Sequence, residues 1–151
     1  MDQDAFLDTY RGMNARICLF EKSILAGQCR CSRSSKLLVA EREGIHCDSD
    51  EAQQQCDDLL KLLRQHGRFA LKLSSEMTSL PHGKAMRIQI GGLRGLYQVL
   101  YPDHQLPVVI DNIHALVCQA RDQFQELGKL PFQEIMKQVA AYQPRRRKPR
   151  S

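Results

Sequence analysis

Cysteine thiols could do more chemistry than any other side chains in this sequence, and they are unevenly distributed. The chain has 6 cysteines, and Cys118 stands alone far downstream. Such clustering has three physical explanations: thiolate ligation of a metal ion or cluster, a disulfide framework, or a helical core that uses cysteine as a small apolar residue. The other cysteines lie in one short stretch: Cys18, Cys29, Cys31, Cys47 and Cys56.

The cellular compartment and the spacing of the cysteines along the chain favour some of these explanations over others. Residues 1–4 lack the basic region and apolar run of a signal peptide, which predicts a cytoplasmic, reducing environment and disfavours disulfides. The spacing C-x10-C-x-C-x15-C-x8-C contains neither the C-x2-C pair of a zinc ribbon nor a usual ferredoxin pattern. Widely spaced thiols on helices and loops suit a cluster, so we expect an iron–sulfur cluster, with zinc as the alternative, held by four of the five. Burial of free cysteines as small hydrophobes ranks next.

Two histidines lie near this chemistry. His46 adjoins one of the clustered cysteines and could serve as a nitrogen ligand, although a loop histidine is the simpler interpretation. His114 and Cys118 are four residues apart, so they share a helical face, but two side chains alone do not make a metal site. A reactive thiol is a further alternative, because Arg30 stands between two cysteines and would lower a thiol pKa.

Length and composition limit the fold that positions these residues. The chain has 151 residues and a mass of 17.3 kDa, which suits one domain that needs neither disulfides nor a metal to fold. Trp is absent and aromatic residues make up 6%, so the core must use Leu, Ile, Val, Ala and Met. No run approaches the roughly 18 apolar residues of a transmembrane helix, so we expect no membrane association.

Apolar residues recur every three or four positions, which predicts an all-α fold. We expect a single compact helical domain over residues 1–143, with about five to six helices and a cysteine-rich loop. Asp48 and Glu51 form a capping box at the start of the third helix. Residues 87–90 also alternate like a short strand, but we favour helix there. The predicted helices span about residues 4–26, 36–43, 48–73, 84–100, 107–127 and 131–143, with the loop at residues 28–35.

Basic residues concentrate at the C-terminus, in residues 144–151. The formal net charge of the chain is +5, which equals the charge of this tail, so the remaining residues are formally neutral. Dense positive charge on a flexible segment attracts phosphate backbones through counterion release. We therefore expect contact with RNA or DNA, alone or in a ribonucleoprotein; an acidic protein is the alternative. The basic residues of the tail are Arg145, Arg146, Arg147, Lys148 and Arg150.

Other basic residues lie at helical spacing in the two central predicted helices. Gly91 lies among them, and a residue without a side chain would let a phosphate come close. The alternative is that these are ordinary solvated helix faces, and that Gly91 with Gly95 lets two helices pack tightly. The residues that we expect to extend the nucleic-acid surface are Arg64, Arg68, Lys72, Arg87 and Arg94.

Catalytic motifs are not found in the sequence. It contains no G-x-x-x-x-G-K-[ST], G-x-G-x-x-G, H-E-x-x-H or G-x-S-x-G pattern, which favours a non-enzymatic role. The leading hypothesis is a metal-bearing, nucleic-acid-binding or ribonucleoprotein accessory factor whose cofactor is structural or redox-sensing. One alternative is an iron–sulfur redox protein or small enzyme that uses the cluster or a reactive cysteine. The other is a protein-interaction adaptor without a cofactor.

Overall fold

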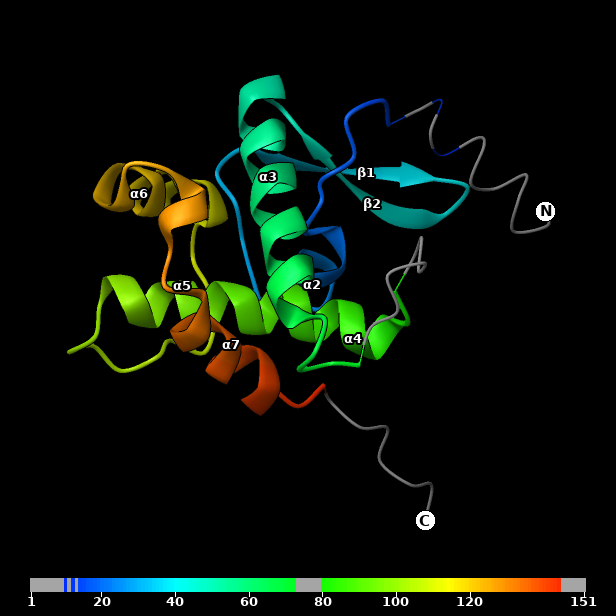
Figure 1. Ribbon diagram of the computed structural model, residues 1–151. Helices are drawn as coiled ribbons and strands as arrows, with labels where there is room; N and C mark the ends of the chain where they lie inside the picture. The colour runs from blue at the N-terminus through cyan, green and yellow to red at the C-terminus, as the bar shows by residue number, and fades with distance from the viewer. Residues whose placement is uncertain (1–9, 11, 13, 73–79, 145–151) are drawn as a thin grey trace, which may run out of the picture.

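The computed structural model describes residues 10, 12, 14–72 and 80–144, which form a mixed α/β fold in which a two-stranded hairpin lies over a group of helices (Figure 1). None of the helices in these ranges is long and apolar enough to cross a membrane. The elements in chain order are α2 (Glu21–Leu25), β1 (Ser34–Val39), β2 (Arg42–Cys47), α3 (Asp50–Gly67), α4 (His82–Met86), the π-helical turn η1 (Arg87–Gly91), α5 (Gly92–Leu100), α6 (Ile113–Phe124), the 3-10 turn η2 (Leu127–Lys129) and α7 (Phe132–Ala141).

The hairpin shows that the predicted all-α fold is wrong. Residues 36–43, expected as a short helix, belong to β1, its turn and β2, which pair antiparallel with Ser34 opposite Cys47. The turn residues Ala40 and Glu41 both have positive φ, 50° and 68°. Tight hairpin turns need this backbone conformation and usually take it from Asn or Gly. An Ala-Glu turn carries no such signal, so the pattern of the neighbouring leucines was compatible with a helix.

The predicted N-terminal helix over residues 4–26 is interrupted. Residues 14–18 run beside β2, and helix resumes only at α2. The backbone N–H of Cys18 donates to the carbonyl of Ile45 over 2.9 Å. This segment therefore gives β2 a partner on the edge that β1 leaves free. Residues 1–9 of the predicted helix lie outside the described part of the chain.

The third predicted helix is confirmed as α3, with shifted ends. Ser49 is its N-cap, because the Ser49 hydroxyl oxygen accepts a hydrogen bond from the backbone N–H of Ala52 over 3.1 Å. The N-cap is therefore one residue later than Asp48, the residue that the capping-box pattern had indicated. The helix ends at Gly67, before the residue 73 that we expected.

The remaining predicted helices are confirmed in type. The helix over residues 84–100 forms as the continuous rod of α4, η1 and α5, so the strand alternative at residues 87–90 is wrong. α6 begins at Ile113, later than expected, because the preceding segment is extended and Ile110 forms a parallel bridge with Cys29. α7 matches the last predicted helix closely.

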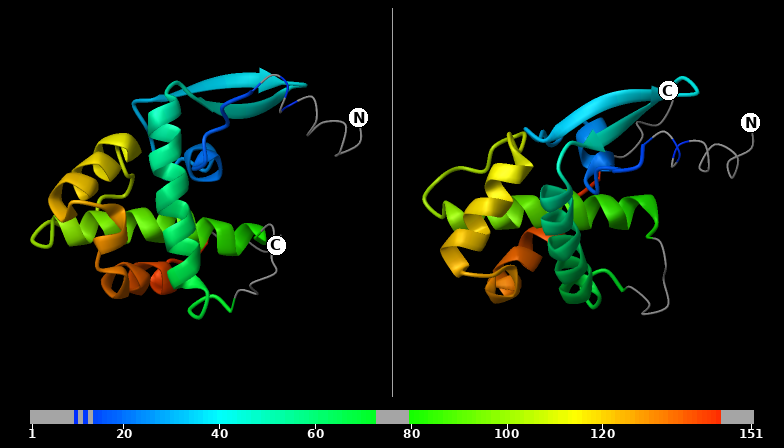
Figure 2. Two further views of the ribbon diagram at one scale, coloured as in Figure 1. Left: turned by 45° about the horizontal axis from the view of Figure 1, so that its top comes forward. Right: turned by 90° about the horizontal axis from the view of Figure 1, so that it is seen from above.

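The rod of α4, η1 and α5 runs through the middle of the fold, where α3 crosses it and α7 packs against it (Figure 2). A Cβ on Gly91 would lie 2.7 Å from the Cα of Val139, and one on Gly95 would lie 2.7 Å from the carbonyl oxygen of Ile135. Both glycines therefore allow the backbones of the rod and α7 to approach. This confirms close helix packing as the structural role of the two glycines.

Candidate functional site

Four of the clustered cysteines line one small cavity. They are Cys18, Cys31, Cys47 and Cys56, hereafter the cavity cysteines. The cavity has a volume of about 20 Å³. Its other lining residues are mainly apolar or neutral, with Arg33 as the charged one: Leu19, Phe20, Arg33, Ser34, Ala52, Gln53, Ile113 and His114.

Each cavity cysteine belongs to a different segment, and the hairpin brings these segments together. Cys18 lies in the extended segment before α2, Cys31 precedes β1, Cys47 ends β2, and Cys56 lies in α3. Because β1 and β2 pair with Ser34 opposite Cys47, the loop that carries Cys31 returns to the end of β2. The convergence of these thiols therefore depends on the strand pairing that periodicity did not predict.

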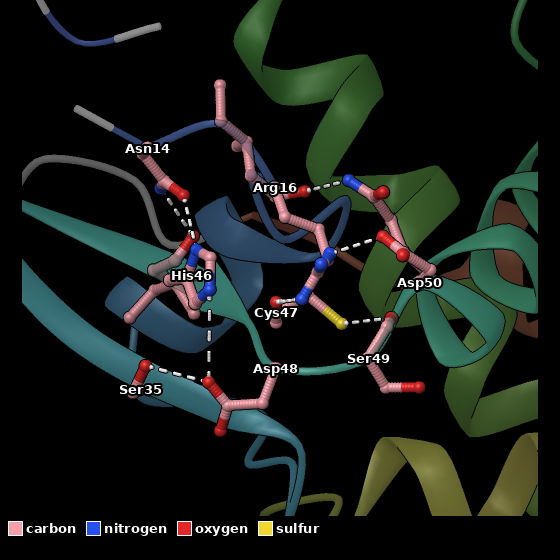
Figure 3. Close-up of polar contacts among 11 residues, drawn as sticks. Asn14, Arg16, Ser35, His46, Cys47, Asp48, Ser49 and Asp50 are labelled. Atoms are coloured by element: carbon pink, nitrogen blue, oxygen red, sulfur yellow. Dashed lines mark hydrogen bonds and ion pairs between the residues drawn. The ribbon is translucent and has the colours of Figure 1, made fainter. Parts of the chain in front are cut away.

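Polar contacts hold the wall of the cavity around Cys47 (Figure 3). The Arg16 guanidinium donates to the Cys47 carbonyl over 3.2 Å and pairs with Asp50 over 2.6 Å. The Cys47 thiol donates to the carbonyl of Ser49 over 3.3 Å. Gln53 donates through its side-chain amide to the carbonyl of Ile17 over 2.8 Å. These bonds tie the segment before α2 and the end of β2 to the first turns of α3.

Burial sets the protonation state of two cavity cysteines. It raises the pKa of Cys18 to about 12, with smaller increases from electrostatic interaction with Cys31 and Cys47. It also raises the pKa of Cys56, which interacts electrostatically with the other three cavity cysteines and with Cys118. Thiols with raised pKa values are neutral near neutral pH and react slowly as nucleophiles. They ionise readily only when a cation replaces their protons.

Cys29 does not join the cavity. Its side chain is 1% exposed and belongs to the main hydrophobic core, and its backbone forms a bridge with Ile110. Burial raises the pKa of Cys29 to about 12, although Arg94 lowers it in part. The predicted reactive thiol next to Arg30 therefore has no support at Cys29, because a reactive cysteine needs a lowered pKa.

The histidines near the cysteines occupy different places. His46 lies within 2.9 Å of the Asn14 side-chain oxygen and 4.0 Å of the Asp48 carboxylate, and it does not line the cavity. His114 does line the cavity, and its Nε2 lies 3.6 Å from the sulfur of Cys118. Burial and nearby arginines lower the pKa of His114. Sequence reasoning recognised the pair four residues apart, but it did not connect His114 to the cysteines of the N-terminal half.

The described residues contain no preformed site for a single metal ion. No three of their His, Cys, Asp or Glu side chains are arranged so that they could hold one. The 6 cysteines all fall within these ranges and are free thiols. A zinc ion requires ligand atoms about 2.0–2.3 Å from one common point, so the zinc alternative stays a prediction without a preformed site among the described residues.

The predicted nucleic-acid residues do not form one continuous face. Lys72 and Arg87 line the same open pocket, whereas Arg64 lines a separate groove. Arg94 donates to the carbonyl of Pro107 over 2.9 Å and is partly buried. Arg68 is exposed at the end of α3. The basic tail residues 145–150 lie outside the described part of the chain.

Comparisons with known proteins return no relatives: no protein family, curated protein or solved structure matches this chain significantly.

Proposed function

We propose that this protein holds an iron–sulfur cluster through the four cavity cysteines, as a structural or redox-sensing cofactor. The observation that supports the proposal is that four thiols from four separate segments line one cavity. If cysteine served only as a small apolar residue, the thiols would be scattered among aliphatic neighbours. Cys29 lies in such an environment. Cys18, Cys31 and Cys56 also pack against the hydrophobic core, but unlike Cys29 they share one cavity with Cys47.

The charge state of the thiols favours a cationic cofactor. Burial keeps Cys18 and Cys56 protonated, and each thiolate raises the pKa of its neighbours. Iron atoms would supply the positive charge that allows several thiolates to lie together. Because ligation displaces protons, cluster loading should improve with rising pH.

The size of the cavity sets a condition on this proposal. A volume of about 20 Å³ accommodates about one water molecule, so a cluster fits only after the thiols rotate away from the centre. In a [4Fe–4S] cluster each cysteine binds its own iron atom, so the sulfurs stand farther apart than around one ion. Rotation of the thiols away from the centre of the cavity would therefore bring the sulfurs closer to the spacing that such a cluster needs. Apolar walls such as Leu19, Phe20 and Ile113 would then limit the access of water to the cluster.

Cysteine variants test the proposal in the full-length protein. We would reconstitute the protein without oxygen, using ferric iron, a thiol reductant and sulfide, and measure iron, acid-labile sulfide and visible absorption per chain. Cys18→Ala and Cys56→Ala should each lose most of the bound iron, because each removes one of four ligands. Cys29→Ala is the control, because Cys29 also belongs to the clustered cysteines but lies in the core, outside the cavity. It should retain wild-type loading.

A urea unfolding curve for each apo variant separates loss of ligation from loss of folding. The proposal is refuted if the wild-type protein binds no iron and sulfide above background. It is also refuted if folded Cys18→Ala, Cys56→Ala and Cys29→Ala proteins all load equally.

A further inference from the structure

An open pocket of about 500 Å³ lies where the chain enters α4 and leaves α7. Pro144, the last described residue, is part of its wall. The sequence after Pro144 continues as Arg-Arg-Arg-Lys-Pro-Arg-Ser. Among the described residues, the lining of the pocket includes three basic side chains, Lys72, Lys84 and Arg87, and no acidic one.

Neighbouring described residues leave the positive charge of this pocket uncompensated. The Lys84 ammonium donates to the backbone carbonyl of Lys72 over 3.5 Å, and the Arg87 guanidinium donates to the Gln143 side-chain oxygen over 3.4 Å. Both acceptors are neutral, and none of the three basic side chains makes an ion pair within the described ranges. Three cationic side chains in one pocket, none paired with a described acidic residue, favour an anionic ligand. Phosphate groups bind well to Arg and Lys.

An exposed aromatic residue stands next to the pocket. Phe69 is 93% exposed and immediately precedes the lining residues Ala70 and Leu71. The backbone N–H of Lys72 donates to the Phe69 carbonyl over 3.4 Å, so both belong to the same turn. The aromatic ring contributes little to the core, but it offers a face on which an unpaired base can stack.

From these two features we infer that the pocket and Phe69 bind single-stranded nucleic acid. Backbone phosphates would contact Lys72, Lys84 and Arg87, while one base stacks on Phe69. A duplex hides its base faces, and an acidic protein has no bases, so the exposed ring favours a single strand over both. This inference does not depend on the iron–sulfur cluster.

Fluorescence anisotropy with the full-length protein tests the inference. The probes are a labelled oligo-dT strand of about 20 nucleotides, the same strand in a duplex, and polyglutamate as a protein-like polyanion. Phe69→Ala should weaken binding of the single strand about tenfold and leave binding of the duplex nearly unchanged. Val108→Ala is the matched control, because Val108 is 83% exposed and does not line the pocket. It should bind as the wild type does.

Salt dependence tests the phosphate contacts separately. Arg87→Ala should reduce the slope of log affinity against log salt by about 0.7, the value for one single-strand phosphate contact. Lys129→Ala, which changes an exposed cation in η2 outside the pocket, should leave the slope unchanged. The inference is overturned if single strands do not bind or if Phe69→Ala and Arg87→Ala have no effect. Binding of polyglutamate or duplex as tight as that of the single strand would also overturn it.

Discussion

The raised pKa of Cys18 predicts slow alkylation of this thiol in the folded apo protein. Its pKa is about 12, against 9.0 for an ordinary cysteine. A difference of three pKa units lowers the thiolate fraction at pH 8 about a thousandfold. A more basic thiolate is also more nucleophilic, which recovers about 20-fold if the Brønsted coefficient is 0.4–0.5. Cys18 should therefore react about 50-fold more slowly than in the unfolded chain.

Iodoacetamide labelling followed by mass spectrometry of the peptide that contains Cys18 measures this rate. The same chain in denaturant serves as the reference, and circular dichroism checks that the native sample remains folded at each pH. Restricted access of the reagent would also slow the reaction, so the pH profile is decisive. In the folded protein the rate should rise about tenfold per pH unit up to at least pH 10, because the thiol is far from half-ionised.

A folded-state rate that levels off near pH 9 would contradict this reasoning. Such a profile would mean that burial restricts access to Cys18 without changing its ionisation. Burial would then give no reason why the cavity needs a cation to hold thiolates.

Two further predictions concern the fold. Gly95→Ala should destabilise the protein by about 1–2 kcal/mol in urea unfolding, because the new Cβ would lie 2.7 Å from the Ile135 carbonyl oxygen. This overpacking outweighs the gain in helix propensity of about 1 kcal/mol that alanine brings over glycine. Unchanged stability would contradict the close packing. Replacing Ala40 by Asn and Glu41 by Gly should stabilise the protein by about 1 kcal/mol, because both positions have positive φ, and a lower thermal midpoint would argue against this turn.

Helices with a wide apolar stripe could be predicted from the sequence. α3, the rod of α4, η1 and α5, and α7 have residues such as Leu59, Leu63 and Ile135 at helical spacing, and the structure buries all three at 1% exposure or less. The π-helical turn inside the rod could not be predicted, because it changes backbone hydrogen bonding without changing the apolar pattern.

The N-terminal third was harder to predict because its local pattern is compatible with two structures. Ile17 and Phe20 fit a helical stripe, yet Ile17 pairs with His46 of β2 across the chain. Leu37 and Leu38 likewise suited a short helix but lie in β1. Strand pairing between distant residues is a tertiary interaction, so local propensity does not determine it.

The sequence by itself indicated that the chemistry of this protein lies in its cysteines, because five of them fall within residues 18–56. Only the tertiary structure decided which thiols come together: Cys29 is buried in the core, while the other four line the cavity with His114. The physical reason is that spacing along the chain limits the separation of two residues, whereas strand pairing and helix packing set the direction in which each side chain points.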